Sequence, residues 1–188
     1  MSILEENWEK IVDSYVFLIE DNAMVVHFDM SMYFESLFAL ENAISDDFHI
    51  TCLFCNLLHK LRPLKMPWFT FVWIQLACEN HFVSTLLSNT QGWDQMATIL
   101  AIFASSLIYV SDMHVKEVFN VLYKSILRFI LVLDHDFPDF LASFAPEFVS
   151  FIPSSFVELH NIILHATPST LQMQPFNPKQ ILKTPGIE

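Results

Sequence analysis

Residues 121–144, VLYKSILRFILVLDHDFPDFLASF, decide the fold of this chain. They contain one apolar helical segment before a short Asp-His-Asp-Phe-Pro break and another after it. From His114 to Leu133, apolar side chains recur at the spacing of one helical face, which predicts a helix. Val121, Leu127 and Leu131 form a second apolar stripe on it. A helix that is apolar on two sides is typical of the interior of a helical stack.

The same periodicity dominates the rest of the chain and favours an all-α fold. Only two glycines occur among the 188 residues, so the tight hairpin turns of a β architecture are not expected. We predict helices at residues 3–20, 31–44, 48–61, 68–88, 93–110, 114–133, 138–151 and 155–166. Such helices, joined by short links, predict stacked antiparallel helix pairs. The arrangement is HEAT-like in architecture, although no strict sequence repeat is present.

Two helix starts are marked by their residues. Pro138 suits the first turn of the helix that follows the Asp-His-Asp-Phe break, because its missing N–H would be unpaired there in any case. Ser155 with Glu158 three residues later matches a capping box. After residue 166 four prolines make a helix unfavourable, and we expect an extended proline-rich C-terminal tail lying across the surface.

The composition is unusually apolar, with 53% hydrophobic residues and a mean hydropathy of +0.41. The longest apolar run, from Met96 to Val110, is shorter than the roughly 20 residues that span a bilayer. We therefore expect inner helices with two buried faces and an outer surface that a partner covers. A membrane-peripheral or lipid-handling helical domain is the alternative. The net charge of −12 argues against direct nucleic-acid binding and against anionic membranes.

No catalytic arrangement is recognisable in the sequence. Cys52 and Cys55 form a Cys-x-x-Cys pair, but a zinc site needs four ligands and Cys78 alone cannot complete it. Their helical, apolar surroundings favour buried structural thiols. The Asp134-His135-Asp136 cluster has no partner set at metal-ligand spacing, which favours capping and turn roles. We expect no enzyme activity, no cofactor and no metal site.

Five sequence segments share the order and spacing of a known family. They are the 121–144 stretch with its His-Asp-Phe-Pro element, residues 57–73 (LLHKLRPLKMPWFTFVW), Gly92-Trp93, Ile152-Pro153 with LHNIILHATP at 159–168, and Pro175-Phe176-Asn177-Pro178. Together they resemble the C-terminal domain of the scaffold (Not-one) subunit of the CCR4-NOT deadenylase complex. The chain departs from the family at Trp68, where a glycine is usual, and at Cys78-Glu79-Asn80, where the family has Ser-His-Arg.

The predicted helices, the prolines near the C-terminus and the extent of the resemblance together divide the chain. We expect residues 1–26 to form an N-terminal helix that matches the family weakly, residues 27–166 the helical scaffold domain, and residues 167–188 the extended tail. The resemblance implies a non-catalytic protein-interaction scaffold. Such a domain docks the Not-two and Not-three/five (Not-box) subunits in mRNA deadenylation, mRNA decay and transcript repression, in cytoplasm and nucleus.

A partner-binding surface can be sought where charge and aromatic rings lie near a proline bend. Trp and Arg are typical interface anchors, whereas Phe69 and Trp73 are better explained as core. We expect the contact face to combine Arg62, Lys65, Trp68, Tyr123, Lys124 and Arg128.

Overall fold

The computed structural model describes residues 3–22, 35–37, 39 and 48–166. Within these ranges the chain is all-α, with residues 35–37 and 39 also helical, as predicted. The elements are α1 (Ile3–Asn22), α3 (Phe48–Lys60), the 3-10 turn η1 (Pro67–Phe69), α4 (Thr70–Ala77), α5 (Asn80–Leu87), the 3-10 turn η2 (Thr90–Gly92), α6 (Trp93–Asp112), α7 (Lys116–Asp136), α8 (Pro138–Phe151) and α9 (Val157–Ala166).

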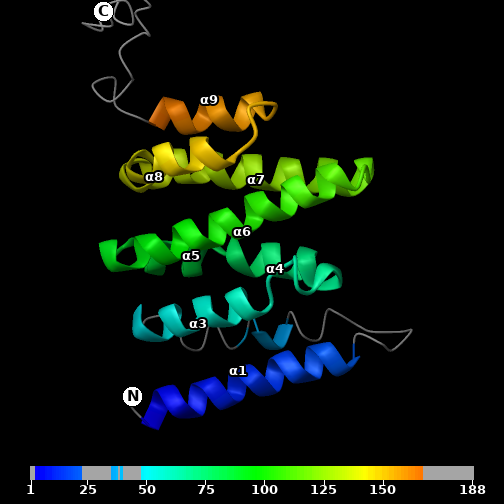
Figure 1. Ribbon diagram of the computed structural model, residues 1–188. Coiled ribbons are helices and arrows are strands. Elements are labelled where there is room, and N and C mark those ends of the chain that lie inside the picture. Colours follow the sequence, from blue (N-terminus) through cyan, green and yellow to red (C-terminus); the bar gives the residue numbers. More distant parts are fainter. Residues whose placement is uncertain (1–2, 23–34, 38, 40–47, 167–188) are drawn as a thin grey trace, which may run out of the picture.

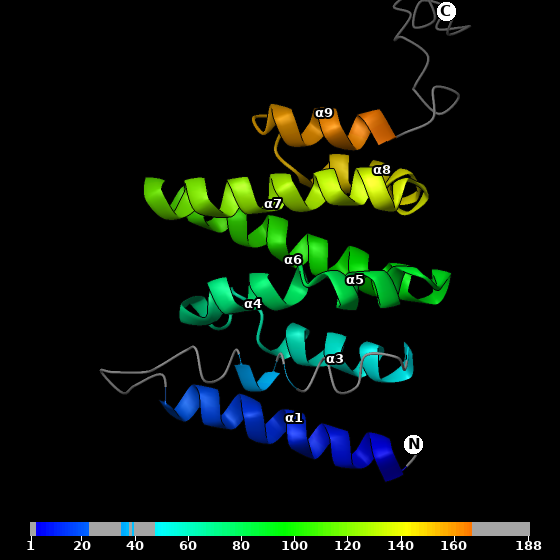
Figure 2. The same cartoon turned by 180° about the vertical axis from the view of Figure 1, so that it is seen from behind.

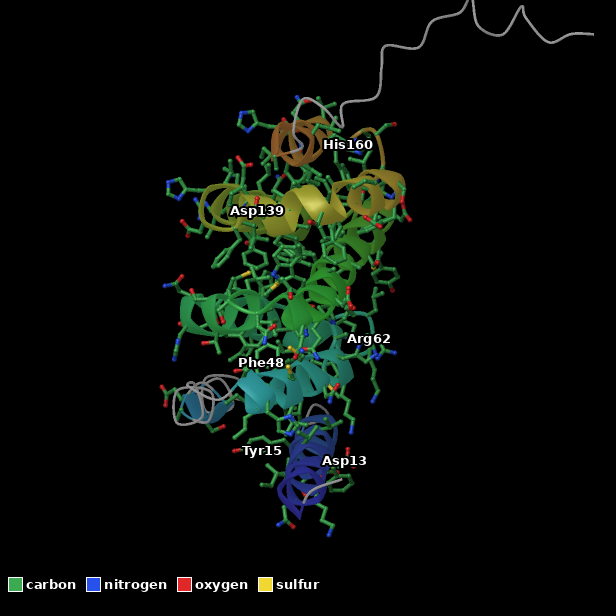
Figure 3. All side chains as sticks on the ribbon, turned by 90° about the vertical axis from the view of Figure 1, so that its left-hand side faces the viewer. Asp13, Tyr15, Phe48, Arg62, Asp139 and His160 are labelled. Carbon is green, nitrogen blue, oxygen red and sulfur yellow. The ribbon has the colours of Figure 1, made fainter. Side chains whose placement is uncertain are left out.

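The helices are stacked in layers, with α1 at one end and α9 at the other (Figures 1 and 2). α3 packs on α1, α5 and α6; α6 packs on α7, and α7 and α8 pack on α9. Side chains fill the space between successive layers, from Asp13 and Tyr15 on α1 to His160 on α9 (Figure 3). The prediction of stacked helix pairs is confirmed, and the predicted C-terminal tail lies outside the described residues.

Two connections that are far apart in sequence lie on the same side of the stack. The start of α4 and the turn between α6 and α7 are both at the right in Figure 1 and at the left in Figure 2. α9 runs from right to left in Figure 1, as α7 does, and its end at Ala166 lies on the opposite side. This arrangement places the residues after Lys60 and the residues after Asp112 next to each other in space.

The predicted helix at 68–88 is wrong, because the chain breaks between α4 and α5. Glu79 adopts an extended conformation (φ −64°, ψ 130°), and its carboxylate accepts a 2.8 Å hydrogen bond from the backbone N–H of Phe82. This N-cap satisfies an amide that a new helix leaves unpaired. The break brings the Phe82 ring to Phe54 of α3, at 5.4 Å between ring centroids.

In the segment 121–144 the helix break lies where the sequence predicts it, but the first helix of the segment, α7, is not an interior helix. α7 ends at Asp136 and α8 begins at Pro138, so the break is confined to Phe137. The first stripe of α7 is buried from Leu122 onward, whereas Val121 and Leu131 of the second stripe are each 50% exposed. The interior placement of α7 is therefore wrong, since its neighbours α6, α8 and α9 leave one face of α7 uncovered.

A capping box at Ser155 is also wrong. α9 begins at Val157, and the backbone N–H of His160 bonds to the carbonyl of Phe156, which occupies the capping position. The Glu158 carboxylate accepts a hydrogen bond from another helix instead.

One stretch of the described chain, Thr90–Asp112, is long and apolar enough to cross a membrane by length and composition. It contains α6, which lies in the middle of the stack and packs on α3, α5, α7 and α8. Burial between these layers accounts for part of its apolar character, since 39% of its most apolar window is buried.

Candidate functional site: an apolar groove beside the α6–α7 turn

A groove of about 240 Å³ lies where the α3–α4 connection meets the end of α6 and the start of α7. Prolines at both ends of the α3–α4 connection shape one wall, because each removes a backbone donor and fixes the local chain direction. The lining is almost entirely apolar: Pro63, Leu64, Pro67, Thr70, Phe71, Ser106, Tyr109, Val110, Met113, Val115, Val118 and Leu122. The two hydroxyls of Thr70 and Ser106 are already bonded to backbone carbonyls at 2.6 and 2.7 Å.

The large apolar side chains around this groove are unusually exposed. Leu64, Phe71, Tyr109, Met113 and Val115 all line it, and each is 43–55% accessible to solvent. Scattered exposed apolar residues are ordinary on protein surfaces, but a contiguous patch indicates an interaction site. The groove offers a surface for packing, with the Tyr109 hydroxyl as the one lining side-chain polar group that no described residue bonds.

Three of the predicted contact residues are close sequence neighbours of residues that line this groove, and we call them the groove rim. Arg62, Lys65 and Trp68 alternate in sequence with the lining residues of the α3–α4 connection. The Arg62 guanidinium donates a 3.1 Å hydrogen bond to the His59 carbonyl, and its side chain extends outward from the stack (Figure 3). Trp68 is 48% exposed, whereas Phe69 is fully buried as predicted.

Tyr123 lies in the contact between α7 and α9. Its ring stacks on Phe119 with centroids 5.6 Å apart and lies 5.7 Å from the Phe156 ring. Its hydroxyl donates a hydrogen bond to the Glu158 carboxylate. Burial, followed by this bond to Glu158, raises the pKa of Tyr123 to about 12, while the donated hydrogen bond lowers the pKa of Glu158. Tyr123 thus contributes to helix packing.

Lys124 and Arg128 occupy a different surface from the groove. On a helix with 3.6 residues per turn, Lys124 points about 200° around the axis from Leu122, which lines the groove. Both cations are exposed and belong to the uncovered face of α7, which also carries Val121. The six predicted contact residues are therefore divided between the groove rim, the α7–α9 contact and the outer face of α7.

The groove residues of α6 and the α6–α7 turn were missed from sequence. Tyr109 and Met113 are four residues apart, so they share one helix face, and Val115 follows within the turn. Apolar residues at the end of a helix and in the next turn were the available signal. What the spacing could not give is their position beside Leu64 and Phe71, because that depends on how distant connections meet.

The remaining candidate groups carry no convergent chemistry. Burial raises the pKa of all three cysteine thiols, that of Cys78 to about 12, which makes them poor nucleophiles and ligands. His135 pairs with Asp136 at 2.6 Å, and this hydrogen bond raises the pKa of that exposed histidine. In the part of the chain that the structure describes, no set of His, Cys, Asp and Glu is grouped to hold a metal ion.

Comparisons with known proteins agree with this architecture. The family model described as "CCR4-Not complex component, Not1" matches residues 35–185. The "General negative regulator of transcription subunit 1" of Schizosaccharomyces pombe is 36% identical over 133 residues, covering 69% of this chain and 6% of that protein. The chain thus spans a small part of that relative's length.

Two solved structures share the fold. The NOT1 superfamily homology domain from Chaetomium thermophilum superposes with a TM-score of 0.78 at 20% identity, over 92% of this chain and 37% of that one. A structure described as the Not1 C-terminal domain in complex with Not4 gives a TM-score of 0.72 at 23% identity, over 93% and 39% of the two chains. With the family match over most of its length, this chain belongs to the Not1 family of CCR4-Not complex components.

Proposed function

We propose that this chain is a non-catalytic docking module that holds other subunits of the CCR4-Not complex, in cytoplasm and nucleus. The partners proposed are the Not-box subunits Not-two and Not-three/five, whose docking would connect deadenylation and transcript repression to the complex. A related domain is described in complex with Not4, which makes Not4 a further candidate. The observation that carries the proposal is the apolar groove bordered by exposed side chains.

The physical argument is that this surface gains free energy when it is covered. Burying apolar area is worth roughly 25 cal/mol per Å². A groove between helices lets an extended segment insert side chains without unfolding the stack. Because the basic residues of the groove rim and of the outer face of α7 are on different sides, a partner that contacts both must wrap around the helices.

The test uses the full chain and purified Not-two, Not-three/five and Not4 from the same source. Isothermal titration calorimetry and co-elution on a sizing column should show a complex with at least one subunit. Absence of binding to all three, with a folded chain by circular dichroism, would contradict the proposal. Flotation with liposomes addresses the membrane-peripheral alternative, and recovery of the chain with the vesicles would favour it.

Charge reversal on α7 maps the second surface. Lys124→Glu should weaken binding about 2–5-fold, as expected for an exposed ion pair worth up to roughly 1 kcal/mol, and should leave the helical signal unchanged. Lys10→Glu is the matched control, because it makes the same charge change on α1 at the far end of the stack. Equal affinities of the two variants would remove the outer face of α7 from the interface.

A further inference from the structure

A second hollow adjoins the groove at the α6–α7 turn. It has a volume of about 300 Å³ and is lined by Val110, Ser111, His114, Val115, Lys116 and Phe119. Val110 and Val115 also line the first groove, so the two hollows share a wall. Val115 is 43% exposed and belongs to both linings, so an occupant of either hollow would touch it; we call it the ridge between the hollows.

The turn that presents this ridge has an uncommon backbone conformation. His114 has φ 59°, and it is the only non-glycine residue with positive φ in the described chain. Its Nδ1 lies 2.7 Å from the Asp112 carbonyl oxygen, which fixes the turn locally. The two residues on either side of it, Met113 and Val115, keep their apolar side chains in solvent. A costly conformation that exposes apolar groups is the kind of outlier from which a binding role can be inferred.

The charge around the two hollows differs from that of the whole chain. The net charge is −12, yet no carboxylate is among the residues that line either hollow. Lys116 lines the second hollow, is exposed and makes no ion pair within the described ranges. Immediate sequence neighbours of the lining residues add Arg62 and Lys65 beside the first groove and Asp112 and Glu117 at the turn, so with Lys116 the basic groups here exceed the acidic ones by three to two. The local surface therefore favours an occupant that is apolar and carries negative charge.

We propose that the two hollows bind one extended segment of a partner subunit, with an apolar side chain in each hollow and a carboxylate beside Lys116. This inference rests on the proposed docking function and specifies its recognition chemistry. Side chains two residues apart on an extended chain are separated by about 7 Å on the same face. Such spacing suits two hollows that are divided by a single ridge, and Val115 would pack between the two anchors.

Other occupants are less well suited. Residues 167–188 of this chain follow Ala166, which lies on the side of the stack opposite to the groove (Figure 1). They contain Lys179 and Lys183 and a single acidic residue, Glu188, so they do not complement Lys116. A second copy of the chain would bring another 12 negative charges, which disfavours self-association.

The affinity test uses the subunit that binds the wild-type chain. Val115→Glu should reduce its affinity at least about 10-fold, since it places a charge against a desolvated apolar anchor. Val157→Glu, at a residue that is 55% exposed near the start of α9, is the matched control and should bind like the wild type. Lys116→Glu should reduce the affinity about 3–5-fold. Lys116→Arg keeps the positive charge and should bind with the affinity of the wild type.

The occupant is identified by crosslinking. p-Benzoylphenylalanine replaces Met113, which is 55% exposed beside the ridge, in the full-length chain. Crosslinks to a Not-box or Not4 segment with apolar and acidic residues would support the proposal. Crosslinks to residues 167–188 or to a second copy would overturn it. If the wild type binds a subunit and Val115→Glu binds it equally well, the groove proposal fails and the docking function stands; if the wild type binds none, the docking function fails.

Discussion

The indole nitrogen of Trp73 on α4 donates a 2.7 Å hydrogen bond to the backbone carbonyl of Leu58 in the last turn of α3. The last carbonyls of a helix have no partner within it, so a buried helix end needs a donor from elsewhere. Trp73 supplies that donor while its ring, fully buried, packs edge-on against Phe103 of α6 at 6.2 Å. One side chain thus joins three successive layers of the stack.

Replacing this residue should be costly for stability. In Trp73→Phe the Leu58 carbonyl loses its partner, which costs about 1–3 kcal/mol for a buried acceptor, and the missing ring atoms leave a cavity that adds to it. We expect the free energy of unfolding, measured by urea denaturation, to fall by at least about 2 kcal/mol. Trp68→Phe is the control. Trp68 is 48% exposed, and its replacement should change stability by less than about 0.5 kcal/mol.

Gly92 precedes α6 in the Gly-Trp pair that the sequence marked as a family feature. Its φ of −85° is open to any residue, so an alanine would be tolerated if the backbone alone mattered. A Cβ at this position would instead lie 2.1 Å from the backbone oxygen of Leu86. We expect Gly92→Ala to lower the free energy of unfolding by about 1–3 kcal/mol, as overpacking does. An unchanged or raised melting temperature would show that α5 can shift at little cost.

α1 is attached to the stack through α3, and two kinds of contact contribute to that attachment. Asp13 pairs with Lys60 at 2.5 Å, but their side chains are 65% and 40% exposed, so the pair is worth less than about 1 kcal/mol. Ile19 is fully buried, and truncating such a side chain costs about 2–5 kcal/mol. Hydrogen exchange in α1 should therefore accelerate strongly in Ile19→Ala and only slightly in Asp13→Asn. The reverse order would mean that the ion pair holds the helix.

The sequence predicts the layers better than it predicts the surface. Apolar periodicity and the proline at 138 locate helices and one helix start, because these depend on residues close in the chain. The break at Glu79 was missed since a glutamate can cap through its side chain without any glycine or proline as a signal. The exposure of Val121 depends on which distant elements pack against α7. The position of Leu64 and Val115 in one groove likewise depends on which connections meet, and spacing along one helix does not contain that information.

The Tyr123–Glu158 hydrogen bond predicts a pH dependence of stability. Glu158 has a lowered pKa in the folded chain because its carboxylate accepts the tyrosine hydroxyl proton. A carboxylate whose folded pKa is depressed contributes stability that is present above its unfolded pKa, about 4.5, and is lost as the pH falls through the lowered value. Tyr123→Phe removes the donor, so the variant should be less stable than the wild type near neutral pH, with the difference shrinking below about pH 4.5.

Urea denaturation near pH 7 and again near pH 3.5 checks this sign. Tyr109→Phe is the control, because the Tyr109 hydroxyl makes no hydrogen bond within the described residues. Its midpoint should differ from the wild type by the same small amount at both pH values. If the deficit of Tyr123→Phe is equally large in acid, the hydroxyl contributes through packing against Phe119 and Phe156, and the bond to Glu158 carries none of the coupling between α7 and α9.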